Sequence, residues 1–244
     1  MNKIIFNFAH KFSAFTLAET LIVMGIIGVV AALTIPNLNS STADKEKVAK
    51  VKKVYSNLND AFGRAQAVYG PFEEWLQLDN TTSAQVTRIG ERMTEFLKTS
   101  KNCANQVNKG CFTTNIRDNK GTIDGDLNVM NDSNASAYKI ILADGSALSF
   151  STFWFGYTAT LDIDGPNKGS STLGKDLFIF YLTDNSVKTI SDINGNYDDC
   201  FSTGYCAGWV INFDNMDYLK VDSSKKCKNN TSIILDGKTN VTCK

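Results

Sequence analysis

The sequence predicts an α+β protein in which a long N-terminal helix, half transmembrane and half amphipathic, packs on an antiparallel β-sheet head. Three observations predict this fold. An apolar run opens the chain, an amphipathic stretch of helical period follows, and short apolar segments separated by turn residues fill the second half. The 244 residues suffice for one sizeable domain beside an extended segment. We expect a cleaved leader (residues 1–14), a transmembrane helix (15–38) and an exported globular head (39–244).

The composition argues against several functional classes. Lys and Arg together number 25, as do Asp and Glu, so the formal net charge is zero and no basic field attracts nucleic acid. The single histidine, His10, lies in the leader. Loss of the leader would leave no histidine, which argues against Ser-His-Asp catalysis, Cys-His catalysis and His-ligated metal sites. We therefore expect a protein that is not an enzyme.

The apolar run has the length of a membrane span. Residues 20–38 carry no charge. As a helix that rises about 1.5 Å per residue, residues 15–35 would cross the roughly 30 Å hydrocarbon layer. Lys3 and Lys11 precede the run without an acid, which places the leader in the cytoplasm and the head on the opposite side. Pro36 removes one helical hydrogen bond, so we expect a bend where the helix leaves the bilayer.

One carboxylate, Glu19, lies near the start of this run. A carboxylate in hydrocarbon costs a few kcal/mol, so it should have a partner. Cleavage between Ala14 and Phe15 would keep the helix and create an α-amino group on Phe15. In staggered neighbouring helices, this amine could pair with Glu19 of the next subunit. The alternative is that Glu19 reaches the cytoplasmic headgroups and favours the local helix dipole.

The stretch Ala14-Phe15-Thr16-Leu17-Ala18-Glu19, followed by the apolar run, resembles the prepilin cleavage and methylation motif. Type IV pilins and type II secretion pseudopilins share this motif. The resemblance covers roughly the first 40 residues. It implies that a prepilin peptidase cuts after Ala14 and N-methylates Phe15, that Glu19 guides subunit stacking into a helical fibre, and that the head is pilin-like. One departure is Ala14 itself, because the family usually has glycine before the cut.

The resemblance favours a structural subunit of a type II secretion pseudopilus, single-pass in a bacterial inner membrane with an exported head. The implied partners are other pilin or pseudopilin subunits, the prepilin peptidase, the inner-membrane assembly platform and the lipid bilayer. One alternative is a type IV pilin, major or minor, for adhesion, motility or DNA uptake. Another is a membrane-anchored exported binding domain that only borrows the export signal.

Two helices are expected at the start of the head. Apolar residues recur at steps of three and four, which predicts a helix with one apolar face as far as about Tyr69, where Gly70-Pro71 ends it. These residues are Val48, Val51, Tyr55, Leu58, Phe62 and Ala65. A shorter helix is expected near residues 84–97, where apolar residues again follow a helical period.

Strand patterns dominate from residue 135 onward. Asp144-Gly145 and Asp184-Asn185 each separate two apolar segments, which predicts two hairpins. The strands are expected over residues 138–143, 148–153, 159–163, 177–183, 187–190 and 209–213. The span 102–136 is rich in Asn, Asp, Gly and Lys and is expected to be a loop.

Six cysteines lie beyond the apolar run, and none forms a CxxC pair. An even number of cysteines in an exported domain predicts disulfides, although six cysteines allow fifteen connectivities. Pairing of neighbours is the simplest choice. It joins Cys103 to Cys111, Cys200 to Cys206 and Cys227 to Cys243. The alternative is reduced, buried thiols in a cytosolic protein.

A loop between two expected strands is rich in oxygen ligands. It holds Asp162, Asp164 and Asn167, and Asp176 follows it. Calcium takes six to eight oxygens, so this loop suits a calcium ion. Some pseudopilins bind calcium in a loop of this general position, so the resemblance supports a calcium site. The alternative is a turn in which Asp and Asn suit the backbone. We expect no other cofactor.

Overall fold

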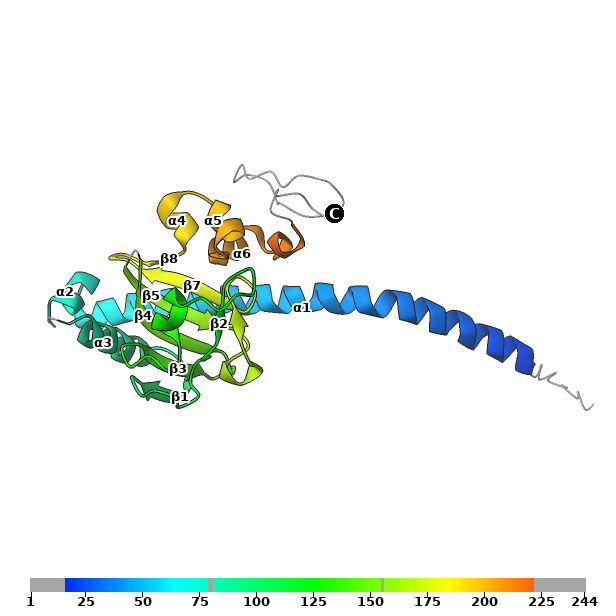
Figure 1. Ribbon diagram of the computed structural model, residues 1–244, viewed down its shortest axis with the longest axis horizontal. Helices are drawn as coiled ribbons and strands as arrows, with labels where there is room; N and C mark the ends of the chain where they lie inside the picture. The colour runs from blue at the N-terminus through cyan, green and yellow to red at the C-terminus, as the bar shows by residue number, and fades with distance from the viewer. Residues whose placement is uncertain (1–15, 79–80, 155, 222–244) are drawn as a thin grey trace, which may run out of the picture. The chain divides into compact units, whose positions relative to one another are not determined.

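The computed structural model describes residues 16–78, 81–154 and 156–221, without the side chains of residues 31–41. The chain divides into two compact units, Met1–Ala43 and Asp44–Lys244. Helix α1 (Leu17–Tyr69) begins in the first unit and ends in the second. All other helices and strands belong to the second unit, which we call the head (Figure 1).

The described head is α+β, as the sequence predicts. Its further α-helices are α2 (Phe72–Gln77), α3 (Thr82–Thr94), α4 (Ile190–Asn194), α5 (Asp198–Ser202) and α6 (Ala207–Phe213). Its 3-10 helices are η1 (Asp126–Met130), η2 (Pro166–Lys168) and η3 (Asp217–Lys220). Its strands are β1 (Thr99–Ala104), β2 (Ile116–Arg117), β3 (Tyr138–Leu142), β4 (Ala147–Phe153), β5 (Gly156–Asp162), β6 (Ser171–Thr172), β7 (Leu177–Leu182) and β8 (Val187–Lys188).

The main sheet has six strands in the order β1-β3-β4-β5-β7-β8, and every neighbouring pair is antiparallel. The two predicted hairpins are present as β3–β4 and β7–β8. Strands β2 and β6 form a separate, parallel pair. Because side chains alternate across a sheet, each strand sends residues to two different cores.

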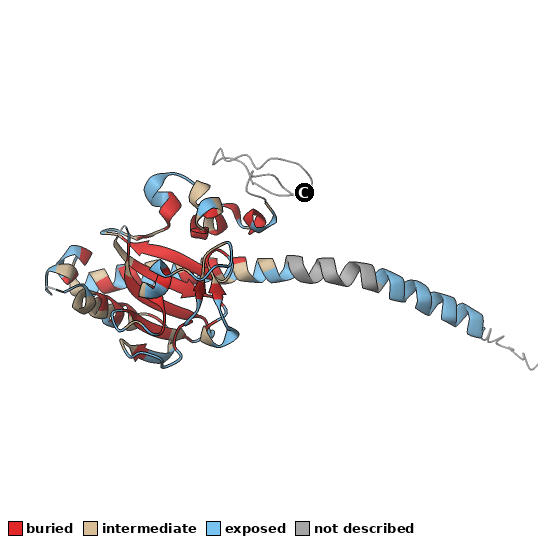
Figure 2. Cartoon of the chain, viewed as in Figure 1, coloured by how far each residue is buried: buried red, intermediate tan, exposed pale blue. Residues whose placement is uncertain are grey.

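The first core lies between the sheet and the part of α1 within the head. The predicted apolar face of the helix is buried there, with Val51, Leu58 and Ala65 each 0% exposed. Helix α3 and sheet residues such as Phe150 complete this core, and buried residues appear red in Figure 2. Helix α1 ends at Tyr69 because Gly70 takes a positive φ of 83° and a proline follows.

The second core lies on the other face of the sheet and is more polar at its centre. Lys139 and Ser149 lie opposite each other on β3 and β4, and both are 0% exposed. The Lys139 ammonium donates to the backbone oxygens of Asp132 (3.4 Å) and Asn134 (2.7 Å). Burial lowers the pKa of this lysine. The segment predicted to be a loop therefore covers the sheet and satisfies a buried cation.

Two predictions of secondary structure are wrong. Residues 209–213 form part of helix α6 and not a strand. Trp209, Val210 and Phe213 are buried while Asn212 is exposed, so tertiary packing at helical spacing overrides the β-propensity of this run. Strand β2 lies wholly within the span 102–136 that was expected to be a loop, and strand β1 lies partly within it. It is a polar edge strand, so no apolar alternation marks it.

Candidate assembly segment and head surface

The first turns of α1 are exposed and carry many large apolar residues, and this part of the helix is pale blue in Figure 2. Their exposed fractions run from 53% for Val23 to 78% for Leu17. The residues are Leu17, Leu21, Ile22, Val23, Met24, Ile26, Ile27, Val29 and Val30. We call residues 16–30 the apolar segment. A helix that is apolar all round is normally buried in lipid or in protein.

Glu19 closes a capping box at the start of α1. The backbone N–H of Thr16 donates to Glu19 Oε2 at 2.9 Å, and the Thr16 hydroxyl donates to the same oxygen at 2.8 Å. In return, the Glu19 N–H donates to Thr16 Oγ1 at 3.3 Å. These bonds satisfy N–H groups that a helix start leaves without partners. The chain thus provides Glu19 with a partner of its own.

The cap occupies only one oxygen of the carboxylate. Within the described residues, no hydrogen bond to Glu19 Oε1 is found. A carboxylate can accept about four hydrogen bonds, so Glu19 can cap its helix and still accept from a cation. Ala14 and Phe15, the predicted processing site, lie outside the described residues. At Pro36, α1 continues as a helix, and its side chain is not described.

Among the helices in the described part of the chain, none is both long and apolar enough to cross a membrane.

Two of the three predicted disulfides are present. Cys103 bonds to Cys111, and Cys200 bonds to Cys206. The first bond ties strand β1 to the loop that follows it, and the second ties α5 to the residue before α6. Cys227 and Cys243 lie outside the described residues. Disulfides of this kind are typical of exported domains.

The loop predicted to bind calcium uses Asp162 as a turn cap. Asp162 Oδ1 accepts from the N–H groups of Asp164 (3.2 Å) and Gly165 (3.1 Å), and Oδ2 accepts from the Ser171 hydroxyl at 2.8 Å. The side chain is fully buried, and this burial is the main reason why its pKa rises to about 6. Both oxygens of this buried carboxylate are therefore engaged in hydrogen bonds within the protein.

Another predicted ligand also has a partner within the protein. Asp176 forms an ion pair of 2.7 Å with Lys47 on α1. In the described parts of the chain, no three side chains of His, Cys, Asp or Glu come together as a possible metal site. The hydrogen bonds of Asp162 match a structural turn, and the calcium site of Asp162, Asp164, Asn167 and Asp176 stays a prediction.

A series of lysines on α1, whose role the sequence analysis missed, attaches this helix to the loops of the head. Besides the pair with Asp176, Lys52 pairs with Asp214, and Lys53 lies 3.5 Å from Asp144. Lys50 donates to the backbone oxygen of Ile163 at 3.5 Å. Their close spacing in the sequence was the available clue, but it does not reveal which loops they meet.

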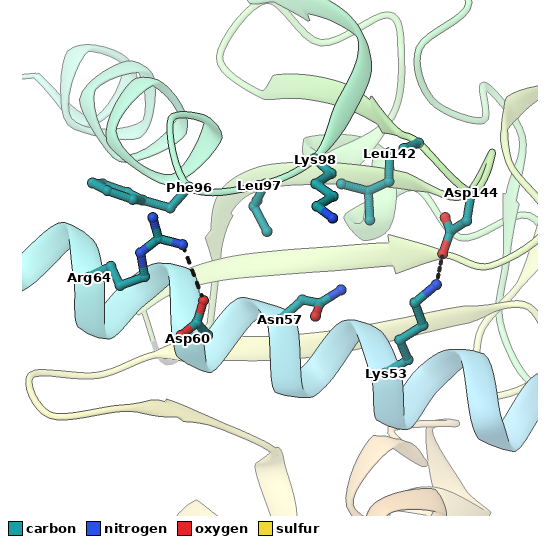
Figure 3. Close-up of a pocket in the computed structure, with 10 residues that line it drawn as sticks. Lys53, Asn57, Asp60, Arg64, Phe96, Leu97, Lys98, Leu142 and Asp144 are labelled. Carbon is teal, nitrogen blue, oxygen red and sulfur yellow. Dashed lines mark hydrogen bonds and ion pairs between the residues drawn. The ribbon is translucent and has the colours of Figure 1, made fainter.

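A groove of about 320 Å³ runs beside α1 on the surface of the head (Figure 3). Its walls come from α1, from the segment between α3 and β1, and from the β3–β4 turn. The lining residues are Lys53, Asn57, Asp60, Arg64, Phe96, Leu97, Lys98, Leu142, Ala143 and Asp144. Arg64 lies 3.6 Å from Asp60 and also stacks over the Phe96 ring. The described lining residues offer polar contacts through Lys53, Asn57 and Lys98 beside these groups.

Comparison with known proteins gives one result for the head. No curated protein matches the chain, and no solved structure does. One family model matches residues 37–235, which cover most of the head and exclude residues 1–36. Because the match covers well over half of the chain, the protein belongs to a family described as of unknown function (DUF6613).

Proposed function

We propose that this chain is a pilin-like structural subunit. Its apolar segment anchors the precursor in a bacterial inner membrane, and its head is exported. After cleavage of the leader, subunits assemble into a helical fibre of the kind built by type II secretion systems and type IV pilus machines. The observation that carries this proposal is a glutamate that caps the exposed, largely apolar start of α1 and uses one of its two oxygens for the hydrogen bonds described.

The apolar segment provides the driving force for assembly. Transfer of one large apolar side chain out of water contributes roughly 1.5–3 kcal/mol. The exposed side chains of residues 16–30 therefore represent a large free energy that the isolated subunit does not gain in water. Lipid surrounds these side chains in the precursor, and neighbouring helices surround them in the fibre.

Glu19 sets the register between the helices of neighbouring subunits in the fibre. In a low-dielectric environment an unpaired carboxylate is unfavourable, whereas an ion pair with good geometry offsets its desolvation. The α-amine of a processed Phe15 is a cation at the required depth. Thr16 holds the carboxylate through Oε2, so Oε1 can accept from the amine of a staggered neighbour. The cap and the intermolecular pair are therefore compatible.

The head supports the same proposal. Its two disulfides suit the oxidising side of the membrane. The part of α1 within the head packs against an antiparallel sheet, which is the arrangement that the prepilin resemblance implies. The charged groove beside α1 offers polar contacts for a neighbouring subunit.

Paired variants can separate the cap from the intermolecular ion pair. Glu19→Gln keeps an oxygen that can accept from Thr16 but removes the charge. Thr16→Ala removes the hydroxyl of the cap but keeps the charge. We expect Glu19→Gln to insert in membranes and to enter sheared fibres poorly, whereas Thr16→Ala enters them nearly as well as the wild type. Fibre entry is measured by immunoblotting of sheared fractions beside total membranes.

The opposite pattern would contradict the proposed role of the charge. Normal fibre entry by Glu19→Gln would leave Glu19 as a helix cap alone. Mass spectrometry of the mature chain gives an independent test. We expect it to begin at N-methyl-Phe15 in cells that hold a prepilin peptidase, and an intact leader in such cells would count against the assignment.

A further inference from the structure

Three aromatic rings form a corner on the head, far along the chain from the apolar segment. Phe153 and Trp154 stack with ring centroids 5.2 Å apart and an angle of 13° between their planes. Tyr205 meets both rings edge-on, with centroids 6.2 Å from Phe153 and 5.9 Å from Trp154. We call these residues the aromatic corner. Phe153 and Tyr205 are buried, whereas Trp154 is 65% exposed.

The backbone holds Trp154 outward at a conformational cost. Its φ of +32° lies in a region that residues with a side chain rarely adopt. Backbone strain of this kind concentrates at functional sites. Trp154 is also the most exposed large apolar side chain of the described head. Packing of the indole into a core does not explain this position, because two-thirds of its surface remains in water.

Two hollows flank the aromatic corner, and both include Phe153, Trp154 and Asp126 in their walls. The larger has a volume of about 480 Å³ and the smaller about 160 Å³. The remaining walls of the smaller hollow include Asp118, Asn119, Lys120, Asp124, Leu173, Ser202, Thr203 and Tyr205. A group of a few heavy atoms could therefore lie against the indole and reach a carboxylate.

The carboxylates make this surface negative. Asp118, Asp124 and Asp126 line the hollows, and Lys120 is the one cation among the lining residues. The pKa of the Tyr205 hydroxyl is raised, first by burial and then by nearby groups that include Asp124 and Asp126. Asp124 Oδ1 accepts from the Asp126 N–H at 2.9 Å, which orients this acidic turn.

We propose that the aromatic corner binds an organic cation: an ammonium or guanidinium group on a small carbon skeleton. The exposed indole of Trp154 carries a negative π-face that attracts such a cation, and tryptophan is the strongest of the aromatic partners. The adjacent carboxylates add Coulomb attraction and select against neutral molecules of the same shape. The residues of this site lie outside the apolar segment, and the proposal of a cation site does not depend on the proposed function.

The test compares two ligands of nearly identical shape on the full-length chain in a non-ionic detergent. Choline carries a quaternary ammonium, and 3,3-dimethyl-1-butanol is its neutral carbon analogue. Saturation-transfer NMR on the ligand methyl signals measures both, and Nα-acetyl-lysine amide tests a protein-like cation beside them. We expect choline or the lysine derivative to bind roughly tenfold more tightly than the neutral analogue. The ratio between the two cations indicates whether the site prefers a small molecule or a protein side chain.

Three variants make the result specific. Trp154→Gly removes the indole and relieves the positive φ, so the fold should persist while binding is lost. Asp126→Asn should weaken binding several-fold and reduce its dependence on salt. Glu91→Gln removes an exposed carboxylate from α3, which packs in the other core, and should leave binding unchanged.

Several outcomes would overturn the proposal. Equal binding of choline and 3,3-dimethyl-1-butanol would show an apolar patch without charge selection. Undiminished choline binding by a folded Trp154→Gly protein would place the cation elsewhere. Tighter binding of methyl glucoside than of either cation would indicate a carbohydrate site instead.

Discussion

The two parts of helix α1 use similar apolar residues in opposite ways. In the apolar segment, Leu21 is 64% exposed and Ile22 is 63% exposed. Within the head, Leu58 and Val51 on the same helix are 0% exposed. The difference lies in pattern. Apolar residues surround the first part, whereas in the second they form one face and charged residues such as Lys53 form the other.

This difference indicates which partner each part requires. An amphipathic helix completes its burial within one domain, because a single partner surface covers its apolar face. A helix that is apolar all round needs surroundings on every side, which one folded head does not provide. The head part of α1 should therefore set the stability of the subunit, and the apolar segment should set its association with lipid and with other copies.

The largest expected change in the free energy of unfolding comes from a leucine-to-alanine substitution in the head part of α1. The same substitution in the apolar segment serves as the comparison. Leu58→Ala should lower the free energy of unfolding of the head by about 2–5 kcal/mol, because it leaves a cavity in the first core. Leu21→Ala should change it by less than about 0.5 kcal/mol. Denaturant unfolding followed by tryptophan fluorescence measures both, since Trp75 and Trp209 are fully buried in the head. A comparable loss in both variants would break the distinction.

Elements with a repeating pattern in the sequence were predicted correctly, and elements determined by tertiary contacts were not. The long periodic face that includes Val51 and Leu58 was predictable, because burial against one surface leaves a repeating pattern. The hairpins around Asp144-Gly145 and Asp184-Asn185 were also predictable, because turn residues separate apolar segments. Helix α6 was not, since Trp209 to Phe213 combine β-propensity with helical packing that only tertiary contacts determine.

The candidate sites were predictable only in part. The position of Glu19 near a helix start followed from the sequence, but its capping box with Thr16 required the backbone geometry. For Asp162, composition alone could not separate a calcium ligand from a turn cap, because both roles favour the same residue types. Trp154 gave no pattern at all, since its exposure depends on a single positive φ and on Tyr205, about fifty residues away.

The disulfides allow a second test of where stability resides. Removal of the Cys103–Cys111 bond by alanine at both positions should lower the free energy of unfolding of the head by about 2–3 kcal/mol, as expected for a short closed loop. Membrane insertion through the apolar segment should not change. Thermal unfolding and membrane fractionation measure the two properties. If the variant fails to insert in membranes, the two parts are not independent.

Asp162 offers a test within the head that depends on pH. Its folded pKa of about 6 lies above its ordinary value of 3.8, so the folded state holds the proton more tightly. The contribution of Asp162 to stability is therefore greatest below about pH 4 and is lost as pH rises to about 6. In Asp162→Asn, the amide oxygen can still accept from the Gly165 N–H, and the amide N–H can donate to the Ser171 hydroxyl. We expect this variant to be roughly 1–3 kcal/mol more stable than the wild type at pH 7.

The control for this prediction is the same comparison at pH 4, where the difference should nearly vanish because both side chains are neutral. Millimolar calcium gives a further check. We expect no shift in the unfolding midpoint, since Asp162 uses both oxygens and Asp176 pairs with Lys47. A calcium-dependent rise that Asp162→Asn abolishes would restore the calcium site.

The smallest change in the free energy of unfolding is expected from loss of a threonine helix cap, which can be tested in both parts of the molecule. The Thr81 hydroxyl accepts from the Ala84 N–H at the start of α3, and Thr16 performs the same task at the start of α1. Loss of such a cap costs about 1 kcal/mol where the helix belongs to the cooperative core. Thr81→Ala should therefore lower the free energy of unfolding of the head by about this amount, and Thr16→Ala should leave it unchanged. Because the same chemical group is removed in both variants, equal losses would mean that the start of α1 unfolds together with the head.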